Sequence, residues 1–572
     1  MKGSAVMNKK KMQVCGLVLT IASLPFVISA ATEIKTVDSV VSLTNELANL
    51  PDKDVIINLQ PGVYDLRGVK MAEGSHLRVD APRNLTIAGL GQDRSETILL
   101  GGGESDLCRV LDLVPSDNYR NIVSNLTVTG GYSQGSGAGI KGNPQRASAN
   151  WIVDCIISNN VSLAKDTKYD GGGGVYCGCA VRTLFADNSS ANAGGAIHCG
   201  KSYNNILPFV EECEFVNNRQ VDSWGNEYGG GAVSCGVATN CTFINNSGVY
   251  GGALGKSIYG GSSAYGCRFT GEATATVNGA ISYGRPLYDC KITNITINAS
   301  EGFYSCTLSG CEISNVTSNV KLFNKCNLSG CTISDVASSG REFFKSCTLS
   351  GCLICDVSLS RVPYVFHNSR MTGCVVRDCS IAESTNGFDF DCAGDASITN
   401  DNCLFVGNYC EYGTLFENKT LVNCTVVSNC SANSNYGLIL ASCKVFNSVL
   451  TGNKVGNELC DVRTVKKVTN ASVYNRLTNC VITASDASID AVVFGNCRMM
   501  TLAEMRFADP SKGDFTPLLR SPLRDAGYSA PWLQNIVGAT DLSGQLRVVG
   551  DGIDIGAFEC QDLPTAMRII VR

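Results

Sequence analysis

Three aspartates form the tightest group of side chains that could carry acid–base or metal chemistry. Asp389, Asp391 and Asp395 lie in one short segment. Carboxylates bind Ca²⁺ through their oxygens, and pairs of them act as acid and base in sugar hydrolysis. Asp389 and Asp391 would share one face of a strand if the segment is extended. We interpret the cluster as a solvated loop, with a Ca²⁺ or catalytic site as the alternative.

Aromatic side chains among polar ones form the second candidate, and we predict ligand binding at these residues. They are Tyr169, Asp170, Trp224, Tyr228 and Tyr250. An aromatic face beside hydrogen-bonding groups suits a sugar or a protein surface. The alternative is that these residues pack on one another within loops. We expect no cofactor and, outside the aspartate cluster, assign no metal ligand and no catalytic residue.

The charge balance excludes some partners. The formal net charge is −5 over 572 residues, and the sequence shows no basic stripe that could neutralise phosphates. We therefore expect no nucleic-acid partner. The three histidines, His76, His198 and His367, stand far apart, which makes a histidine metal site an unfavourable interpretation.

The elements that must position these groups are indicated by a repeated phrase. It consists of cysteine, any residue, an aliphatic residue or Phe, any residue, and then Asn or Asp, as in Cys311-Glu-Ile-Ser-Asn315. The alternation predicts a strand with one buried face, and the last residue predicts a turn. Tight copies begin at Cys155, Cys213, Cys241, Cys290, Cys311 and Cys331, and looser ones at Cys267, Cys352, Cys374, Cys403, Cys424, Cys443 and Cys480.

The spacing of the copies predicts the fold. Copies from Cys290 to Cys352 lie 20 or 21 residues apart, room for three short strands and three turns per coil. A second column repeats as Cys306-Thr-Leu-Ser-Gly-Cys311. We predict an all-β, right-handed parallel β-helix. A leucine-rich horseshoe is the rival, but its Leu-x-x-Leu-x-Leu signature is missing. Apolar residues between Val40 and Leu50 recur at helical intervals and predict a short capping helix.

The 30 cysteines can be interpreted from this geometry. Stacked strands lie about 4.8 Å apart, whereas a disulfide prefers Cβ atoms about 3.8 Å apart. We therefore expect the column cysteines to be small buried hydrophobes with free thiols. The alternatives are disulfides among Cys177, Cys179 and Cys199, or a thiol metal site at Cys177-Gly-Cys179.

Insertions at one place in successive coils explain the grouping of the aromatic residues. Extra residues enter at 161–170, 219–228 and 247–250, with the short segment 189–193 between the first two. Equivalent insertions on stacked coils emerge on one side. We expect them to form a single rim that carries the predicted ligand-binding residues.

Two stretches resemble known families. Gly194-Gly-Ala-Ile197, Gly230-Gly-Ala-Val233 and Phe215-Val-Asn-Asn218 are similar to polymorphic outer-membrane-protein repeats. Near the end, Ser521-Pro-Leu-Arg-Asp-Ala-Gly527 and Asp554-Ile-Gly-Ala-Phe-Glu559 resemble the closing module of bacterial secreted proteins called choice-of-anchor Q. The resemblance implies a bacterial, exported, pectin-lyase-like superhelix with a C-terminal capping module.

Enzymes on such a scaffold are mostly polysaccharide lyases and hydrolases, so cleavage is one hypothesis. The pectate-lyase pattern Arg-x-Pro-x-x-Arg is matched only by Arg361-Val-Pro363, where Phe366 replaces the last Arg. No Asp-Asp pair exists in the sequence. We therefore favour binding or adhesion to a polysaccharide or a surface protein, with a lyase or hydrolase second and a structural spacer third.

An export signal is predicted at the start of the chain. Lys9, Lys10 and Lys11 precede an apolar run of residues 14–28, and Ser29-Ala-Ala31 follows with small residues suited to cleavage. We expect residues 1–31 to be a signal peptide, residues 32–500 the β-helix, and residues 501–572 the C-terminal module. The mature protein would then be extracellular or at the cell surface, without a membrane span.

Overall fold

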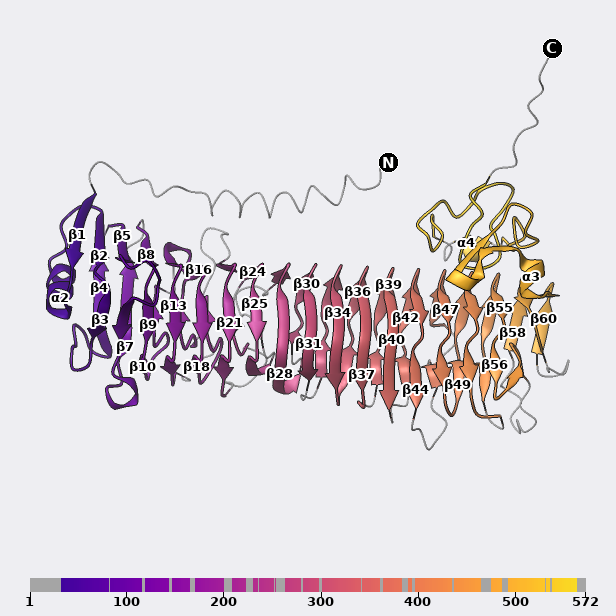
Figure 1. Cartoon of the computed structure of the whole chain (residues 1–572), viewed down its shortest axis with the longest axis horizontal. Coiled ribbons are helices and arrows are strands. Elements are labelled where there is room, and N and C mark those ends of the chain that lie inside the picture. The colour runs from indigo at the N-terminus through magenta and orange to yellow at the C-terminus, as the bar shows by residue number, and fades with distance from the viewer. Residues whose placement is uncertain are drawn as a thin grey trace, which may run out of the picture.

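The computed structural model shows a long solenoid of stacked coils, with helix α2 (Val40–Ala48) at one end and strand β60 (Val492–Gly495) at the other (Figure 1). The structure describes residues 32–562 except 82, 116–118, 144–146, 165–169, 200–207, 223–229, 235, 251–252, 254–262, 279–280, 298–300, 341, 361–363, 383–388, 393–396, 435–436, 464–474, 486–491, 530 and 535–537.

Each coil contributes strands to three faces. One face is a 19-stranded sheet and the second a 28-stranded sheet. The third face has a 6-stranded part followed by an 8-stranded part. One turn illustrates the path, with strands β31 (Lys291–Ile297), β32 (Glu301–Tyr304), β33 (Thr307–Ser309) and β34 (Glu312–Ser318). Pairing between coils is parallel, for example β31 with β34, so the predicted parallel β-helix is confirmed.

The predicted cysteine column is confirmed. Backbone hydrogen bonds step from one member to the next, as where Glu312 N donates to Cys290 O and Thr332 N donates to Cys311 O. All members are buried with free thiols that donate to main-chain carbonyls, as from Cys290 Sγ to Ala264 O at 3.6 Å. The column contains Cys213, Cys241, Cys267, Cys290, Cys311, Cys331 and Cys352.

Cys443 begins a looser copy of the phrase but does not belong to this column. Lys444 N donates to Lys419 O, which places Cys443 in the second column, that of Cys306. The first column passes instead through Ser448, whose hydroxyl accepts a hydrogen bond from Cys424 N at 3.0 Å. The two columns share the same local phrase, so the sequence alone does not separate them.

The Asn and Asp residues of the phrase make the corners. Asn217, Asn315 and Asp335 have φ of +54°, +51° and +52°. This left-handed region is costly for most residues and is tolerated by Asn and Asp. The next residue adds a ladder inside the coil, because Asn218 N donates to Asn246 Oδ1 at 2.9 Å and Asn188 N donates to Asn218 Oδ1 at 3.1 Å.

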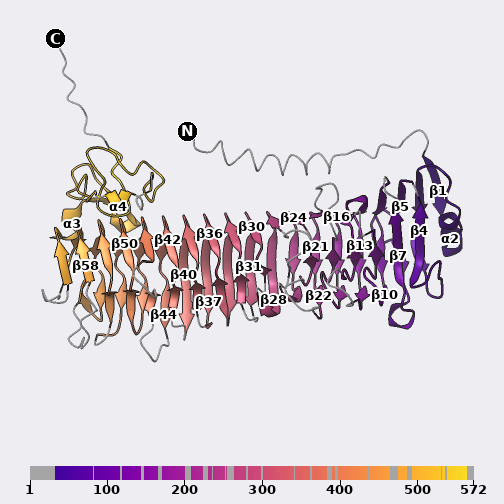
Figure 2. The ribbon, with the colours of Figure 1, turned by 180° about the vertical axis from the view of Figure 1, so that it is seen from behind.

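Both ends of the solenoid carry other structure. Helix α2 begins after the capping residue Ser39 and buries Leu43 and Leu47, as its apolar spacing predicts. After the last coil, strands β62 (Phe507–Asp509) and β63 (Asp514–Pro517) pair antiparallel. The segment from residue 501 onward packs on the flank of the final coils (Figure 2). Within the described residues no helix is long and apolar enough to cross a membrane.

Candidate ligand-binding face

The insertions enter where the chain leaves the 28-stranded sheet for the third face. Their first residues are strands that pair coil on coil, namely β14 (Val161–Ser162), β18 (Ser189–Ser190), β22 (Arg219–Gln220) and β26 (Ser247–Tyr250). The expectation that the insertions start at one stacked position is therefore confirmed. Tyr169, Trp224 and Tyr228 lie outside the described residues, and only the backbone of Tyr250 is placed.

Asp170 is the predicted ligand-binding residue whose side chain the structure describes. It is half-buried, and its Oδ1 accepts a hydrogen bond from Ser136 Oγ at 3.0 Å. Ser136 Oγ in turn accepts from Gly171 N at 3.2 Å. These bonds fix Asp170 at the edge of the 6-stranded part of the third face.

This part of the face contains a column of side chains directed away from the interior of the coils, and all of them except Lys141 are buried. Its register runs Asp112, Lys141, Tyr176, His198 and Ser234, one residue from each successive coil. Neighbouring members are therefore about 4.8 Å apart along the axis, the spacing of paired strands. The preceding residue in each strand, such as Val175 or Ile197, points into the core.

Charged groups gather at the first end of the column. Asp112 is 2% exposed, and its Oδ2 lies 3.1 Å from Arg109 Nη1 and 3.8 Å from Lys141 Nζ. Desolvation lowers the pKa of Lys141. The positive charges of Arg109 and Arg78 lower it further, whereas the negative charge of Asp112 opposes the shift. Lys141 is thus a half-buried amine that holds its proton less tightly than an exposed lysine does.

An aromatic pair lies at the middle of the column. The rings of Tyr176 and His198 stack with centroids 5.5 Å apart and an interplanar angle of 22°. Burial lowers the pKa of His198 to about 4, against the opposing effects of the Ser234 backbone and of Asp170, so the imidazole is neutral at physiological pH.

Several polar atoms of the column have no hydrogen-bond partner within the described part of the chain. These atoms are both ring nitrogens of His198, Ser234 Oγ and Asp112 Oδ1. His198 and Ser234 are each 1% exposed. Buried polar groups nearly always find partners, so such atoms in a row mark a place where a polar ligand would gain hydrogen bonds.

The sequence interpretation missed this column because its members look unrelated. Tyr176, His198 and Ser234 follow Gly174-Val175, Gly195-Ala-Ile197 and Gly231-Ala-Val233, so each is the second residue of a strand that a glycine pair precedes. Alignment on the glycine motif, and not on the cysteines, would have revealed them. His198 is a packed residue, 1% exposed, whose ring stacks on that of Tyr176.

Both interpretations of the aspartate cluster, the solvated loop and the Ca²⁺ or catalytic site, are corrected for Asp391. This residue is 0% exposed and points into the coil, where Lys419 Nζ lies 2.7 Å from its Oδ1 and Asn400 Nδ2 donates to its Oδ2 at 2.6 Å. Its carboxylate is therefore bonded inside the coil and closed to solvent. Asp389 begins strand β45 (Asp389–Cys392) with only its backbone described, and Asp395 lies outside the described residues.

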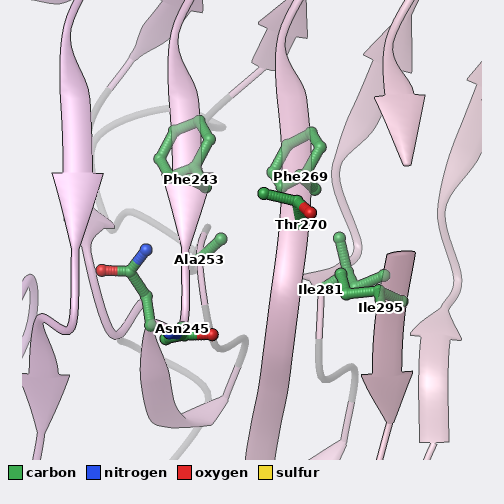
Figure 3. Close-up of a pocket in the computed structure, with 8 residues that line it drawn as sticks. Phe243, Asn245, Ala253, Phe269, Thr270, Ile281 and Ile295 are labelled. Carbon is green, nitrogen blue, oxygen red and sulfur yellow. The ribbon is translucent and has the colours of Figure 1, made fainter. Parts of the chain in front are cut away.

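A small pocket lies among Phe243, Phe269, Ile281 and Ile295, with Asn245 and Thr270 as polar neighbours (Figure 3). None of its described lining residues is charged, so these residues offer no acid–base group. Elsewhere in the described part of the chain, no three His, Cys, Asp or Glu side chains come together as a metal site. Cys177 and Cys179 are free buried thiols, whereas Cys199 is disulfide-bonded.

Comparisons with known proteins found distant structural likenesses alone. No family model and no curated protein matches the chain. A mannuronic acid-specific family 6 polysaccharide lyase from human gut microbiota is 10% identical, with a TM-score of 0.32 over 59% of this chain and 86% of that one. A family 6 alginate lyase is 11% identical, with a TM-score of 0.29 over 81% of this chain and 89% of that one. A tailspike protein of E. coli bacteriophage HK620 is 14% identical, with a TM-score of 0.24 over 80% of this chain and 74% of that one.

Proposed function

We propose that this chain is an exported surface protein that binds a glycan along the third face of its β-helix, between the rim and the column. The observation that carries the proposal is the column itself. Tyr176 and His198 stack in register, and His198 and Ser234 hold buried polar atoms that no described protein group satisfies. A protein surface could also supply partners, which makes it an outcome of the test.

The chemistry of the column fits hydroxyl-rich ligands. Sugar hydroxyls both donate and accept, so they can satisfy a neutral imidazole and a serine hydroxyl alike. Charges of both signs are present, since Arg109 and Lys141 contact Asp112 and the charge of Asp170 acts on His198. A site with charges of both signs has no strong demand for a charged ligand. The aromatic residues of the rim, Trp224 among them, would supply apolar faces for sugar rings.

Binding should therefore depend on His198 and Trp224. We expect His198→Leu, which keeps the volume but removes both ring nitrogens, and Trp224→Ala to weaken polysaccharide binding about tenfold or more. The measurement is calorimetric titration of the full chain with alginate, xylan and dextran. Tyr288→Ala is the matched control, because Tyr288 stacks on Tyr265 on the 19-stranded sheet, away from this face.

The proposal fails if none of the three polysaccharides binds, or if the control weakens binding as much as the test variants do. Unchanged affinity with His198→Leu, with thermal unfolding also unchanged, would move the site away from the column. Binding of a surface protein in place of every polysaccharide would retain the face and replace the ligand class.

A lyase is the second candidate, favoured by one observation. Desolvation lowers the pKa of Lys141, and an amine with a lowered pKa can act as a base near neutral pH. Arg109 beside it could stabilise negative charge that develops on a sugar carboxylate. Release of unsaturated ends from alginate, lost in Lys141→Met while binding is kept, would support this reaction; binding without new ends would exclude it for alginate.

A further inference from the structure

Two unsatisfied acceptor oxygens lie on the 8-stranded part of the third face. Asn324 Nδ2 donates to Glu301 Oε1 at 2.6 Å, whereas Glu301 Oε2 and Asn324 Oδ1 have no partner in the described part of the chain. Glu301 is 8% exposed and Asn324 is 7% exposed. Both groups are therefore more than nine-tenths buried with acceptor capacity left over.

Glu342 lies in the same column as Glu301, and both of its carboxylate oxygens have partners. Glu342 accepts contacts from Lys321 at 3.2 Å, Lys345 at 3.2 Å and His367 Nδ1 at 2.5 Å. These hydrogen bonds outweigh desolvation and lower its pKa. The lysines of the cluster are thus directed at Glu342, and the second oxygen of Glu301 is left open.

The charges around Glu301 restrict what could fill that position. Desolvation raises its pKa, opposed by Asn324 and by the positive charges of Lys321, Lys345 and Lys325. A metal ion or an ammonium group at Glu301 would be repelled by these three lysines. The missing donors should therefore be neutral, and hydroxyl groups meet that requirement.

An aromatic ring lies next to these acceptors. Tyr304 pairs in register with Asn324 and is half-buried. Lys325 Nζ lies 3.4 Å from its hydroxyl and 5.6 Å from its ring centroid, which holds the ring in place. An apolar ring face beside two acceptors is the arrangement that fits a sugar ring with adjacent hydroxyls.

We propose that Glu301, Asn324 and Tyr304 form a second sugar subsite, which takes a pair of neighbouring hydroxyl groups on one sugar ring. This inference rests on the proposed glycan-binding function. Strand β23 (Val233–Ser234) and strand β32 occupy the same place in their coils, each between the 28-stranded and 19-stranded faces. The subsite and the column therefore lie along one side of the solenoid, and a single polysaccharide chain parallel to the axis would contact both.

The test uses the full chain with size-fractionated alginate, xylan and dextran. We expect Glu301→Gln, which turns an open acceptor into a donor, and Asn324→Leu each to weaken binding of long chains about tenfold. Glu312→Gln is the control for charge, because Glu312 is exposed and paired with Lys291 on the 28-stranded sheet. Asn327→Leu, at an exposed position of strand β36 (Asn327–Ser329), is the control for the amide.

The outcomes separate the two proposals. Binding that is unchanged in both Glu301→Gln and Asn324→Leu, but weakened in His198→Leu, overturns the subsite and leaves the column as the site. Equal weakening in Glu312→Gln also overturns it, because the effect would then be one of general charge. Absence of binding by the unaltered chain overturns the proposed function and the subsite with it. Thermal unfolding of each variant shows whether the fold is retained.

Discussion

The pair Asp391 and Lys419 interrupts two ladders in the core. Asp391 stands between Phe366 and Phe416 in a column of stacked phenyl rings. Lys419 occupies a position of the second cysteine column, next to Cys443. Breaking a buried ion pair leaves an uncompensated charge, which typically costs about 3–5 kcal/mol, whereas replacing both partners is often neutral. We expect Lys419→Met to destabilise the fold by about that amount.

The double variant Asp391→Phe with Lys419→Cys restores both ladders, so we expect its stability to lie close to that of the unaltered chain. Denaturant unfolding of the two single variants and the double variant measures the coupling. If the double variant is as unstable as Lys419→Met alone, the pair makes no independent contribution. Exposed Lys291→Met serves as a control for the loss of a lysine.

Residue alternation predicted the cysteine and Phe positions of the 28-stranded sheet correctly, since those strands bury every second residue. It failed on the third face. There two consecutive residues are buried, as Phe343 with Phe344 and Phe390 with Asp391. Strict alternation therefore does not hold in strands β38 (Glu342–Lys345) and β45, and alternation was the basis for placing Asp389 and Asp391 on one face.

The cysteine columns are the element whose chemistry can be tested directly. Burial raises the pKa of Cys155 and of Cys443 to about 12, which leaves little thiolate to react at neutral pH. Cys497, half-buried at the last coil, differs: hydrogen bonding from Cys480 lowers its pKa to about 7. Cys430 is also half-buried, but burial raises its pKa.

Brief alkylation of the native, unreduced protein should therefore label Cys497 before Cys430 and leave the column cysteines unlabelled. Mass spectrometry of digested protein identifies the sites. After denaturation without reductant, the column cysteines should all become labelled. Pairwise disulfide links within the column would contradict the free-thiol column, and labelling of Cys430 as fast as Cys497 would contradict the expected difference between the pKa values of these two thiols.

The C-terminal segment is held to the flank of the solenoid by polar contacts. Asn447 Nδ2 donates to Tyr528 O at 2.9 Å, and Arg547 is buried beside Glu559 and Asp554. Desolvation raises the pKa of Glu559 from 4.5 to about 7. The folded state therefore binds the Glu559 proton more tightly than the unfolded state does. Its contribution is fully present below pH 4.5 and is lost as the pH rises through about 7.

We accordingly expect the segment to resist limited proteolysis better at pH 5 than at pH 8, with most of the change falling between the two pKa values of Glu559. Glu559→Gln, which stays neutral, should flatten this dependence. The control is Glu504→Gln on helix α3 (Leu502–Met505), an exposed carboxyl whose pKa is lowered by its Thr501 hydrogen bonds. An unchanged slope in Glu559→Gln would show that other groups set the pH response.

On the scale of the whole molecule, repeated coils place equivalent residues in columns along one axis, so a few residues per coil define a long surface. The third face carries both the Tyr176 column and the Glu301 cluster for which we propose a subsite. The sequence predicted the coils and the place of the insertions. It did not predict the ligand-facing columns, because their members vary in type from coil to coil.

The central claim is that a glycan lies along the third face. Hydrogen–deuterium exchange of the full chain, with and without the polysaccharide that binds, tests it most directly. With polysaccharide bound, we expect slower amide exchange in peptides that contain strands β15 (Val175–Tyr176), β19 (Ile197–His198) and β32. We expect no change in β33 and β36 of the 19-stranded sheet. Protection confined to the 19-stranded or 28-stranded sheet would contradict it.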